Sequence, residues 1–213
     1  MFDELLEKLI QEDNLSDCVN QYSKKTENHK ITINNLKLYL NNIYKRSPKY
    51  LFIGEAPGYR GCRITGIPFT SKFILTQDYG NGLFGTNNGY NNINQEQPYN
   101  ESTATIIWQY FKNKKIIPFF WNAFPFHPHK KDNYNSNRLP TDDELIIGKK
   151  YIDELLKIFE NEKKHIKIVS IGKTPHKLLK NNSIYIRHPS RGGKNDFING
   201  MNSLENMPDK NGF

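Results

Sequence analysis

Three short segments of this chain carry the side chains best suited to chemistry. The first, GEAPGYRGCRITGIPFTS, holds the carboxylate of Glu55, the second, WNAFPFHPH, holds the amide of Asn122, and the third, RHPSRGGKNDF, holds the imidazole of His188. A carboxylate can accept a proton, an amide pairs with donors and acceptors, and an imidazole can stabilise a group that gains negative charge. Together these residue types fit recognition of a polar ligand combined with acid–base or electrostatic catalysis.

Each segment follows a short apolar run that is typical of a buried strand. We predict strands over residues 50–53, 116–121, 166–171 and 183–186. Helices are predicted between them, over 101–111, over 142–159 with Thr141 and Glu144 as a capping box, and from Thr174-Pro175 onward. This alternation predicts an α/β three-layer sandwich, with a short central parallel four-stranded sheet flanked by helices. Ligands bind beyond the carboxyl ends of such strands, so the three segments should meet there.

The rest of the chain is expected to belong to the same domain. Helical spacing of apolar residues predicts a helical N-terminal part over about 1–45, and the Asn- and Gly-rich stretch 79–100 is interpreted as a long loop that is either functional or disordered. With 213 residues and 36% hydrophobic content, residues 1–213 are interpreted as a single domain, and as a monomer.

Composition narrows the class of protein. Only Cys18 and Cys62 occur, too few for a disulfide framework or for a four-cysteine iron–sulfur or zinc site, so no cofactor or metal is expected. No apolar run reaches the ~18 residues of a membrane span, and the acidic N-terminus is unlike a signal peptide, so we expect a soluble, intracellular protein. The net charge of +8 fits a polyanionic partner, and equally a solvated lysine-rich surface.

The three segments resemble motifs of the uracil-DNA glycosylase superfamily. The GEAPG that starts at Gly54 is similar to that superfamily's water-activating motif, in the form found in its iron–sulfur members, and the HPS that starts at His188 resembles its second motif. The TGIPF that ends at Phe69 is similar to its base-stacking segment, and Asn122 matches the asparagine that reads uracil. The resemblance covers roughly residues 50–199, with the four features in the superfamily's order.

The resemblance implies a set of site residues. They are Glu55 and His188 as catalytic residues, Gly54, Ala56, Pro57, Gly58, Phe69 and Asn122 as substrate contacts, and Arg63, Ser190, Arg191 and Lys194 as DNA contacts. Asn122 would pair with the O4 and N3–H edge of uracil, Phe69 would stack on the flipped base, and His188 would donate to O2 of the leaving base. Backbone amides around Gly61 and Gly66 are expected to approach phosphates.

Several roles remain alternatives. Many superfamily members have an acid where this chain has Ala56, so Glu55 either takes over the activation of water or leaves catalysis to electrostatics. The tyrosine that excludes thymine in relatives corresponds to Gly58, which leaves the range of accepted bases open. Arg191 is expected either to fill the gap left by the flipped base or to contact a phosphate. His127 and His129 are not expected to bind a metal, because no carboxylate or cysteine is suitably spaced.

The resemblance therefore implies a DNA-repair glycosylase that hydrolyses the N-glycosidic bond of uracil or a related deaminated base in DNA. One alternative is a member of the same fold that binds DNA or a base without cutting. Another is an enzyme acting on a small molecule, such as a nucleoside hydrolase or esterase, which would lack the steep salt dependence of DNA binding.

Overall fold

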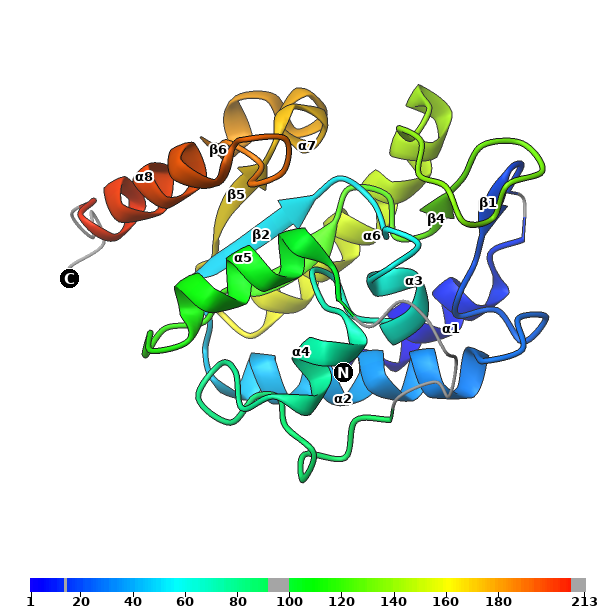
Figure 1. Ribbon diagram of the computed structural model, residues 1–213, viewed down its shortest axis with the longest axis horizontal. Helices are drawn as coiled ribbons and strands as arrows, with labels where there is room; N and C mark the ends of the chain where they lie inside the picture. The colour runs from blue at the N-terminus through cyan, green and yellow to red at the C-terminus, as the bar shows by residue number, and fades with distance from the viewer. Residues whose placement is uncertain (14, 92–99, 208–213) are drawn as a thin grey trace.

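A parallel four-stranded sheet forms the centre of the computed structural model, which describes residues 1–13, 15–91 and 100–207 (Figure 1). Its strand order is β3-β2-β5-β6. The strands are β2 (Tyr50–Gly54), β3 (Phe119–Asn122), β5 (Lys167–Ile171) and β6 (Ile184–Ile186). The predicted α/β fold with four parallel strands is confirmed, and the largest boundary difference is at β3, where residues 116–118 precede the strand.

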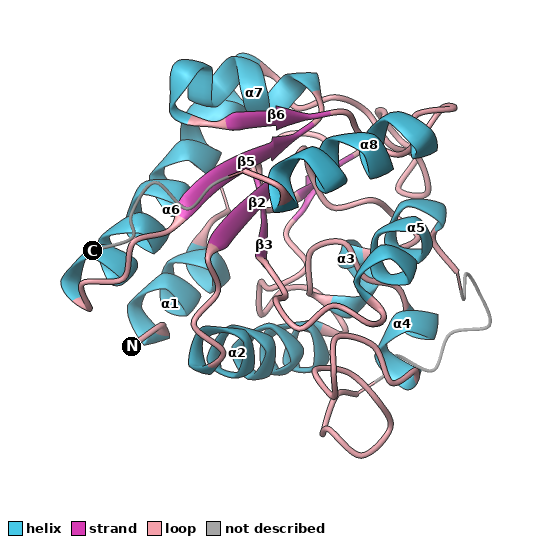
Figure 2. Cartoon of the chain, turned by 90° about the vertical axis from the view of Figure 1, so that its left-hand side faces the viewer, coloured by secondary structure: helices cyan, strands magenta, loops and turns pink. Residues whose placement is uncertain are grey.

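Helices cover both faces of this sheet, which gives the predicted three layers (Figure 2). The helices of the described residues are α1 (Asp3–Gln11), α2 (His29–Lys45), α3 (Cys62–Thr65), α4 (Lys72–Thr76), α5 (Ser102–Phe111), α6 (Asp142–Asn161), α7 (Lys173–Leu179) and α8 (Lys194–Glu205), with a 3-10 turn at Lys180–Asn182. Helices α1 and α6 lie on one face, and α5 and α8 on the other. Neighbouring side chains of β3 alternate accordingly. Phe119 packs on Phe159 of α6 and Phe120 on Phe111 of α5, with ring centroids 5.4 and 5.8 Å apart.

The N-terminal part is mostly helical, as expected, but it also contains a short strand. Strand β1 (Cys18–Val19) pairs antiparallel with β4 (His127–Pro128), and this ties the N-terminal part to the chain that follows β3. Two-residue strands carry no periodic signal, which explains why the sequence did not predict them. Of the predicted loop over 79–100, residues 79–91 and 100 have no helix or strand, and 92–99 lie outside the described residues.

Helix α6 fixes the chain at the end of β3. The predicted capping box is confirmed, with the Thr141 side chain accepting from the Glu144 amide and the Glu144 side chain accepting from the Thr141 amide. Gly148 lets this helix approach so closely that a Cβ atom there would lie 1.8 Å from the Ala123 carbonyl oxygen. The residue before Ala123 is Asn122, so the position of α6 directly affects one predicted site residue.

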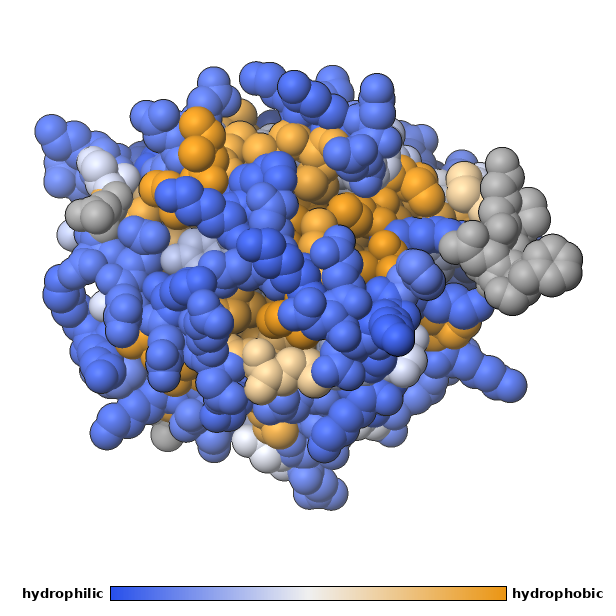
Figure 3. Space-filling view, turned by 180° about the vertical axis from the view of Figure 1, so that it is seen from behind, coloured by the Kyte–Doolittle hydropathy of each residue, from blue (hydrophilic) through white to orange (hydrophobic). Residues whose placement is uncertain are grey.

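Seen from behind, the molecule is mostly hydrophilic, with apolar side chains exposed in the upper middle of this face (Figure 3). Within the described residues, no helix combines the length and the apolar character needed to cross a membrane.

Candidate active site

Gly54, Phe69 and Asn122 converge at the carboxyl edge of the sheet. Gly54 ends β2 and is in register with Asn122, the last residue of β3. A Cβ atom on Gly54 would lie 2.3 Å from Cζ of Phe69 and 2.9 Å from Oδ1 of Asn122. Only a glycine therefore allows the aromatic ring and the amide to share the end of this strand.

Phe69 is held in an unusual backbone conformation. Its φ of 55° is in the left-handed region, which costs a residue with a side chain about 1–2 kcal/mol. Its carbonyl oxygen accepts a 2.8 Å hydrogen bond from Nε1 of Trp108, and its ring packs 5.3 Å from that of Phe120. The ring is only half-buried, so part of its surface is available to a ligand.

The amide of Asn122 is oriented by a buried thiol. Its Nδ2 donates to Sγ of Cys62 across 3.9 Å, and only 4% of Asn122 is exposed. Burial raises the pKa of the Cys62 thiol to about 12, so the sulfur stays protonated. A buried amide whose nitrogen has a fixed partner presents a defined donor and acceptor pattern to a ligand.

Glu55 lies immediately after β2, with its carboxylate half-buried. Oε2 accepts a 2.5 Å hydrogen bond from Oγ1 of Thr174, in the first turn of α7. Its backbone oxygen accepts from the amide of Phe124, which links it to the chain after β3. Among the described residues no donor contacts Oε1, so this oxygen can interact with a water molecule or a ligand.

One nitrogen of the His188 imidazole, Nδ1, is hydrogen-bonded to the nearby Ser190. Its Nδ1 accepts a 3.2 Å hydrogen bond from the backbone amide of Ser190 and lies 2.8 Å from that residue's Oγ. A neutral ring whose Nδ1 is an acceptor carries its proton on Nε2. Burial, together with the charges of Arg187 and Arg191, lowers the pKa of His188 to about 4. Near pH 7, His188 is therefore a neutral donor through Nε2.

Two glycines shape the turn that holds this imidazole. A Cβ atom on Gly193 would lie 2.2 Å from the carbonyl oxygen of His188, and one on Gly172 would lie 3.2 Å from its Cβ. Gly172 also has a φ of +99°, a conformation that side chains rarely adopt. The segment that carries His188 is thus tightly packed against the end of β5.

The residues predicted to contact DNA are only partly grouped. Arg191 and Lys194 are exposed beside His188, and Ser190 is engaged by the His188 ring. Arg63 donates instead to the carbonyl oxygen of Tyr134 and to Oδ1 of Asn135, at 2.8 and 2.9 Å. Burial lowers the pKa of its guanidinium.

The glycines divide into those that face open space and those that pack internally. A Cβ atom on Gly58 would meet nothing closer than 3.9 Å, and one on Gly192 nothing within 4 Å, so both leave room for a ligand. In contrast, a Cβ atom on Gly61 would lie 2.7 Å from the Thr70 oxygen, and one on Gly66 would lie 2.2 Å from the Thr32 oxygen. The close approach at Gly61 and Gly66 is therefore to the chain's own backbone, and the approach of the amides around them to phosphates stays a prediction. Ala56 and Pro57 lie between Glu55 and Gly58. The carbonyl oxygen of Pro57 accepts a 2.7 Å hydrogen bond from Nδ1 of His127.

Sequence reasoning missed several residues that contact the site. Thr174 and Cys62 each contact a predicted site residue, and fully buried His127 contacts Pro57. Thr174 carried a usable signal, because it follows a predicted strand at the edge where ligands bind. Within the described part of the chain, no group of three His, Cys, Asp or Glu side chains could hold a metal ion.

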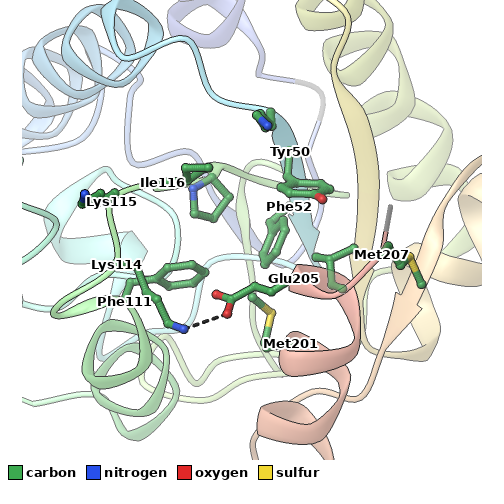
Figure 4. Close-up of a pocket in the computed structure, with 12 residues that line it drawn as sticks. Tyr50, Phe52, Phe111, Lys114, Lys115, Ile116, Met201, Glu205 and Met207 are labelled. Atoms are coloured by element: carbon green, nitrogen blue, oxygen red, sulfur yellow. Dashed lines mark hydrogen bonds and ion pairs between the residues drawn. The ribbon is translucent and has the colours of Figure 1, made fainter. Parts of the chain in front are cut away.

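A cavity of about 350 Å³ lies elsewhere, between α5, α8 and the start of β2 (Figure 4). Tyr50 and Phe52 line it, and an ion pair of 2.7 Å joins Lys114 to Glu205 across it. Tyr50 is the first residue of β2 and Gly54 is the last. This cavity is therefore at the amino ends of the strands, whereas Asn122 is at their carboxyl ends. It is therefore separate from the candidate active site.

The parallel sheet and its covering helices share their fold with a solved structure, that of SMUG2 from Pedobacter heparinus, with a TM-score of 0.60, 16% sequence identity, and coverage of 96% of this chain and 98% of that chain. No protein-family model and no curated protein matches the sequence. At this identity the likeness concerns the fold.

Proposed function

We propose that this protein is a DNA glycosylase, which flips uracil or a related deaminated base out of DNA and hydrolyses its N-glycosidic bond. The observation that supports this most directly is the convergence of Gly54, Phe69 and Asn122 at the carboxyl ends of the strands. Strand β6 also ends there, and the His188 segment follows it. An aromatic ring, a fixed amide and a neutral imidazole donor are the groups that recognition and release of a pyrimidine require.

Recognition depends on Phe69 and Asn122. The exposed part of the Phe69 ring offers a surface on which a base stacks, worth about 1–3 kcal/mol. The Asn122 amide pairs with the O4 and N3–H edge of uracil, while cytosine has the opposite pattern at the same positions. Since Cys62 takes one hydrogen of Nδ2, the remaining hydrogen and Oδ1 are available to the base.

Bond cleavage depends on His188. As the bond between C1′ and the base breaks, its electron pair moves onto the base, and the sugar becomes oxocarbenium-like. Nε2–H of His188 donates to O2 of the departing base and stabilises this negative charge. A donor that is already oriented by Ser190 does so without reorganisation.

Completion of the reaction requires water at C1′. The Oε1 atom of Glu55 positions this water and accepts its proton as the new C1′–O bond forms. Thr174 holds the other carboxylate oxygen, which limits rotation of the group. Exposed Arg191 and Lys194 contact phosphates, and Gly58 and Gly192 leave room for the DNA strand.

The decisive experiment is a cleavage assay on oligonucleotides that contain one uracil, hypoxanthine, xanthine or G·T mismatch, followed by alkali. We expect abasic sites at uracil, also in the presence of a metal chelator. His188→Ala should lower the single-turnover rate by about 10², the effect of deleting one oriented donor, and should change DNA affinity little. His165→Ala is the matched control, because His165 is exposed at the amino end of β5.

Each other outcome favours a specific alternative. A wild-type protein that binds DNA with a steep salt dependence but releases no base is a non-catalytic binder, which the engagement of Glu55 by Thr174 would then explain. A protein that neither binds DNA nor releases a base favours an enzyme for small molecules. A His188→Ala rate equal to that of wild type removes His188 from the mechanism.

A further inference from the structure

Residues 130–139, which follow β4, form a loop fastened to the segment after β2. The backbone amide of Tyr59 donates to Oδ1 of Asn137 at 3.0 Å. The guanidinium of Arg63 donates to the carbonyl oxygen of Tyr134 and to Oδ1 of Asn135. The loop therefore lies beside the candidate active site.

A buried histidine connects this loop to the Gly54–Gly58 motif more directly. His127 is fully buried, with Nδ1 at 2.7 Å from the Pro57 oxygen and Nε2 at 3.3 Å from the Tyr134 oxygen. Burial is the main cause that lowers the pKa of His127 to about 4, so the ring is neutral and donates to Pro57 through Nδ1, the shorter contact. One side chain thus spans from the site motif to Tyr134.

The base of the loop is equally fixed. Arg138 donates from Nε to the carbonyl oxygen of His129 at 2.9 Å, and its Nη2 forms a 2.6 Å ion pair with Glu144 in the first turn of α6. Both charged side chains of this pair are mostly buried. The loop is therefore a rigid part of the site's rim.

What this loop presents to solvent is an aromatic ring flanked by charge. Tyr134 is 63% exposed, and its ring lies 4.8 Å from that of His129, while its carbonyl oxygen accepts the hydrogen bond from Arg63 and lies 3.3 Å from Nε2 of His127. Lys130 and Lys131 are exposed beside it, with one acidic neighbour, Asp132. A large, rigid side chain that is fixed through its backbone loses little entropy when it binds a partner.

We propose that Tyr134 is a further DNA contact of this protein, which stacks on a base or sugar beside the flipped nucleotide while Lys130 and Lys131 bind phosphates. The inference rests on the proposed function for its partner. Charge favours DNA over a protein partner, because two lysines flank the ring and the chain carries a net charge of +8.

Affinity for undamaged DNA tests this proposal without any need for catalysis. Fluorescence anisotropy on a labelled oligonucleotide should give about tenfold weaker binding for Tyr134→Ala and about the wild-type affinity for Tyr134→Phe, because stacking needs only the ring. The control is Ile116→Ala, which removes another apolar side chain that is 49% exposed. It lies just before β3, at the amino ends of the strands. The double variant Lys130→Ala, Lys131→Ala should lower the slope of log K against log salt by about two units.

The outcomes separate this inference from the proposed function. If Tyr134→Ala binds DNA within about twofold of wild type at an unchanged melting temperature, the proposal is wrong, whatever the cleavage assay gives. If the wild type binds DNA, Tyr134→Ala binds weakly and no base is released, the contact stands and the glycosylase assignment fails. A Tyr134→Phe variant as weak as Tyr134→Ala also overturns the stacking role.

Discussion

The hydrogen bond between Glu55 and Thr174 leaves two roles for one carboxylate. With Oε2 held by Thr174, Oε1 can position water, or the group can serve only to connect the segment after β2 to the start of α7. These roles differ in what they affect. A catalytic carboxylate changes the rate and its pH dependence, whereas a structural one changes the stability of the fold.

Glu55→Gln distinguishes the two roles. If Glu55 acts on water, the single-turnover rate should fall by about 10² to 10⁴ and the acidic limb of the pH profile should disappear. Thr174→Val should reproduce part of this loss of rate. Thr174→Ser, which keeps the hydroxyl, should retain a rate close to that of the wild type. A rate loss below about tenfold, with an intact acidic limb and a lower melting temperature, would assign Glu55 a structural role.

Asn122→Asp tests how the base is read. The carboxylate cannot donate to O4 of uracil, and it also loses the hydrogen bond to Cys62, so most uracil release should disappear. The same variant is expected to gain slow release of cytosine, whose exchanged pattern a protonated acid can match. Rates on both bases, measured beside the melting temperature, check this. Full uracil activity would show that another residue reads the base.

At the scale of elements, the sequence predicted what is periodic or apolar over several residues. The four strands and α6 were found because each is a continuous apolar run or has a capped apolar stripe. Helix α8 was missed, although Phe197, Met201 and Leu204 are buried at helical spacing. The contact of Thr174 with Glu55 could not be predicted, because it joins residues far apart in the chain and depends on how α7 sits at the end of β5.

The close contact between α6 and β3 predicts a difference between two helical glycines. Gly148→Ala places a Cβ on the Ala123 oxygen, so α6 must move, which typically costs about 1–3 kcal/mol and also displaces Asn122. In α8, the Cβ of Gly200→Ala would meet the side chain of Ile186, with Cγ2 nearest at 3.1 Å, and the gain in helix propensity should offset the crowding. Thermal unfolding and uracil release should both decline for Gly148→Ala alone. Equal effects of the two variants would contradict this account.

For the whole molecule, two histidines, the buried His127 and the half-buried His188, make stability depend on pH. The pKa values of His127 and His188 are both lowered to about 4 in the folded protein, from 6.5. Between pH 6.5 and 4 the unfolded chain therefore binds more protons than the folded one, and these residues destabilise the fold as the pH falls through that range. Above it their effect is absent.

Melting temperatures measured from pH 8 to pH 5 should therefore decline below about pH 6.5, before most carboxylates titrate. His127→Asn, which can still donate to the Pro57 carbonyl oxygen, should flatten this decline while lowering the melting temperature at pH 8 only modestly. Exposed His165→Asn is the control and should leave the curve unchanged. Parallel curves for the wild type and His127→Asn would show that burial of this ring does not govern the acid response.

The strand order also determines how much of the chain must be synthesised before the sheet can form. The central strand β2 pairs on one side with β3 and on the other with β5, so the second edge of β2 is covered only after the residues of β5, which begin at Lys167, have been synthesised. Such long-range pairing slows folding, and until it is complete the apolar centre of β2 is exposed to other chains. A nascent chain that lacks β5 therefore has neither a finished sheet nor the His188 segment, and its uncovered strand edge favours aggregation until synthesis has passed Ile171.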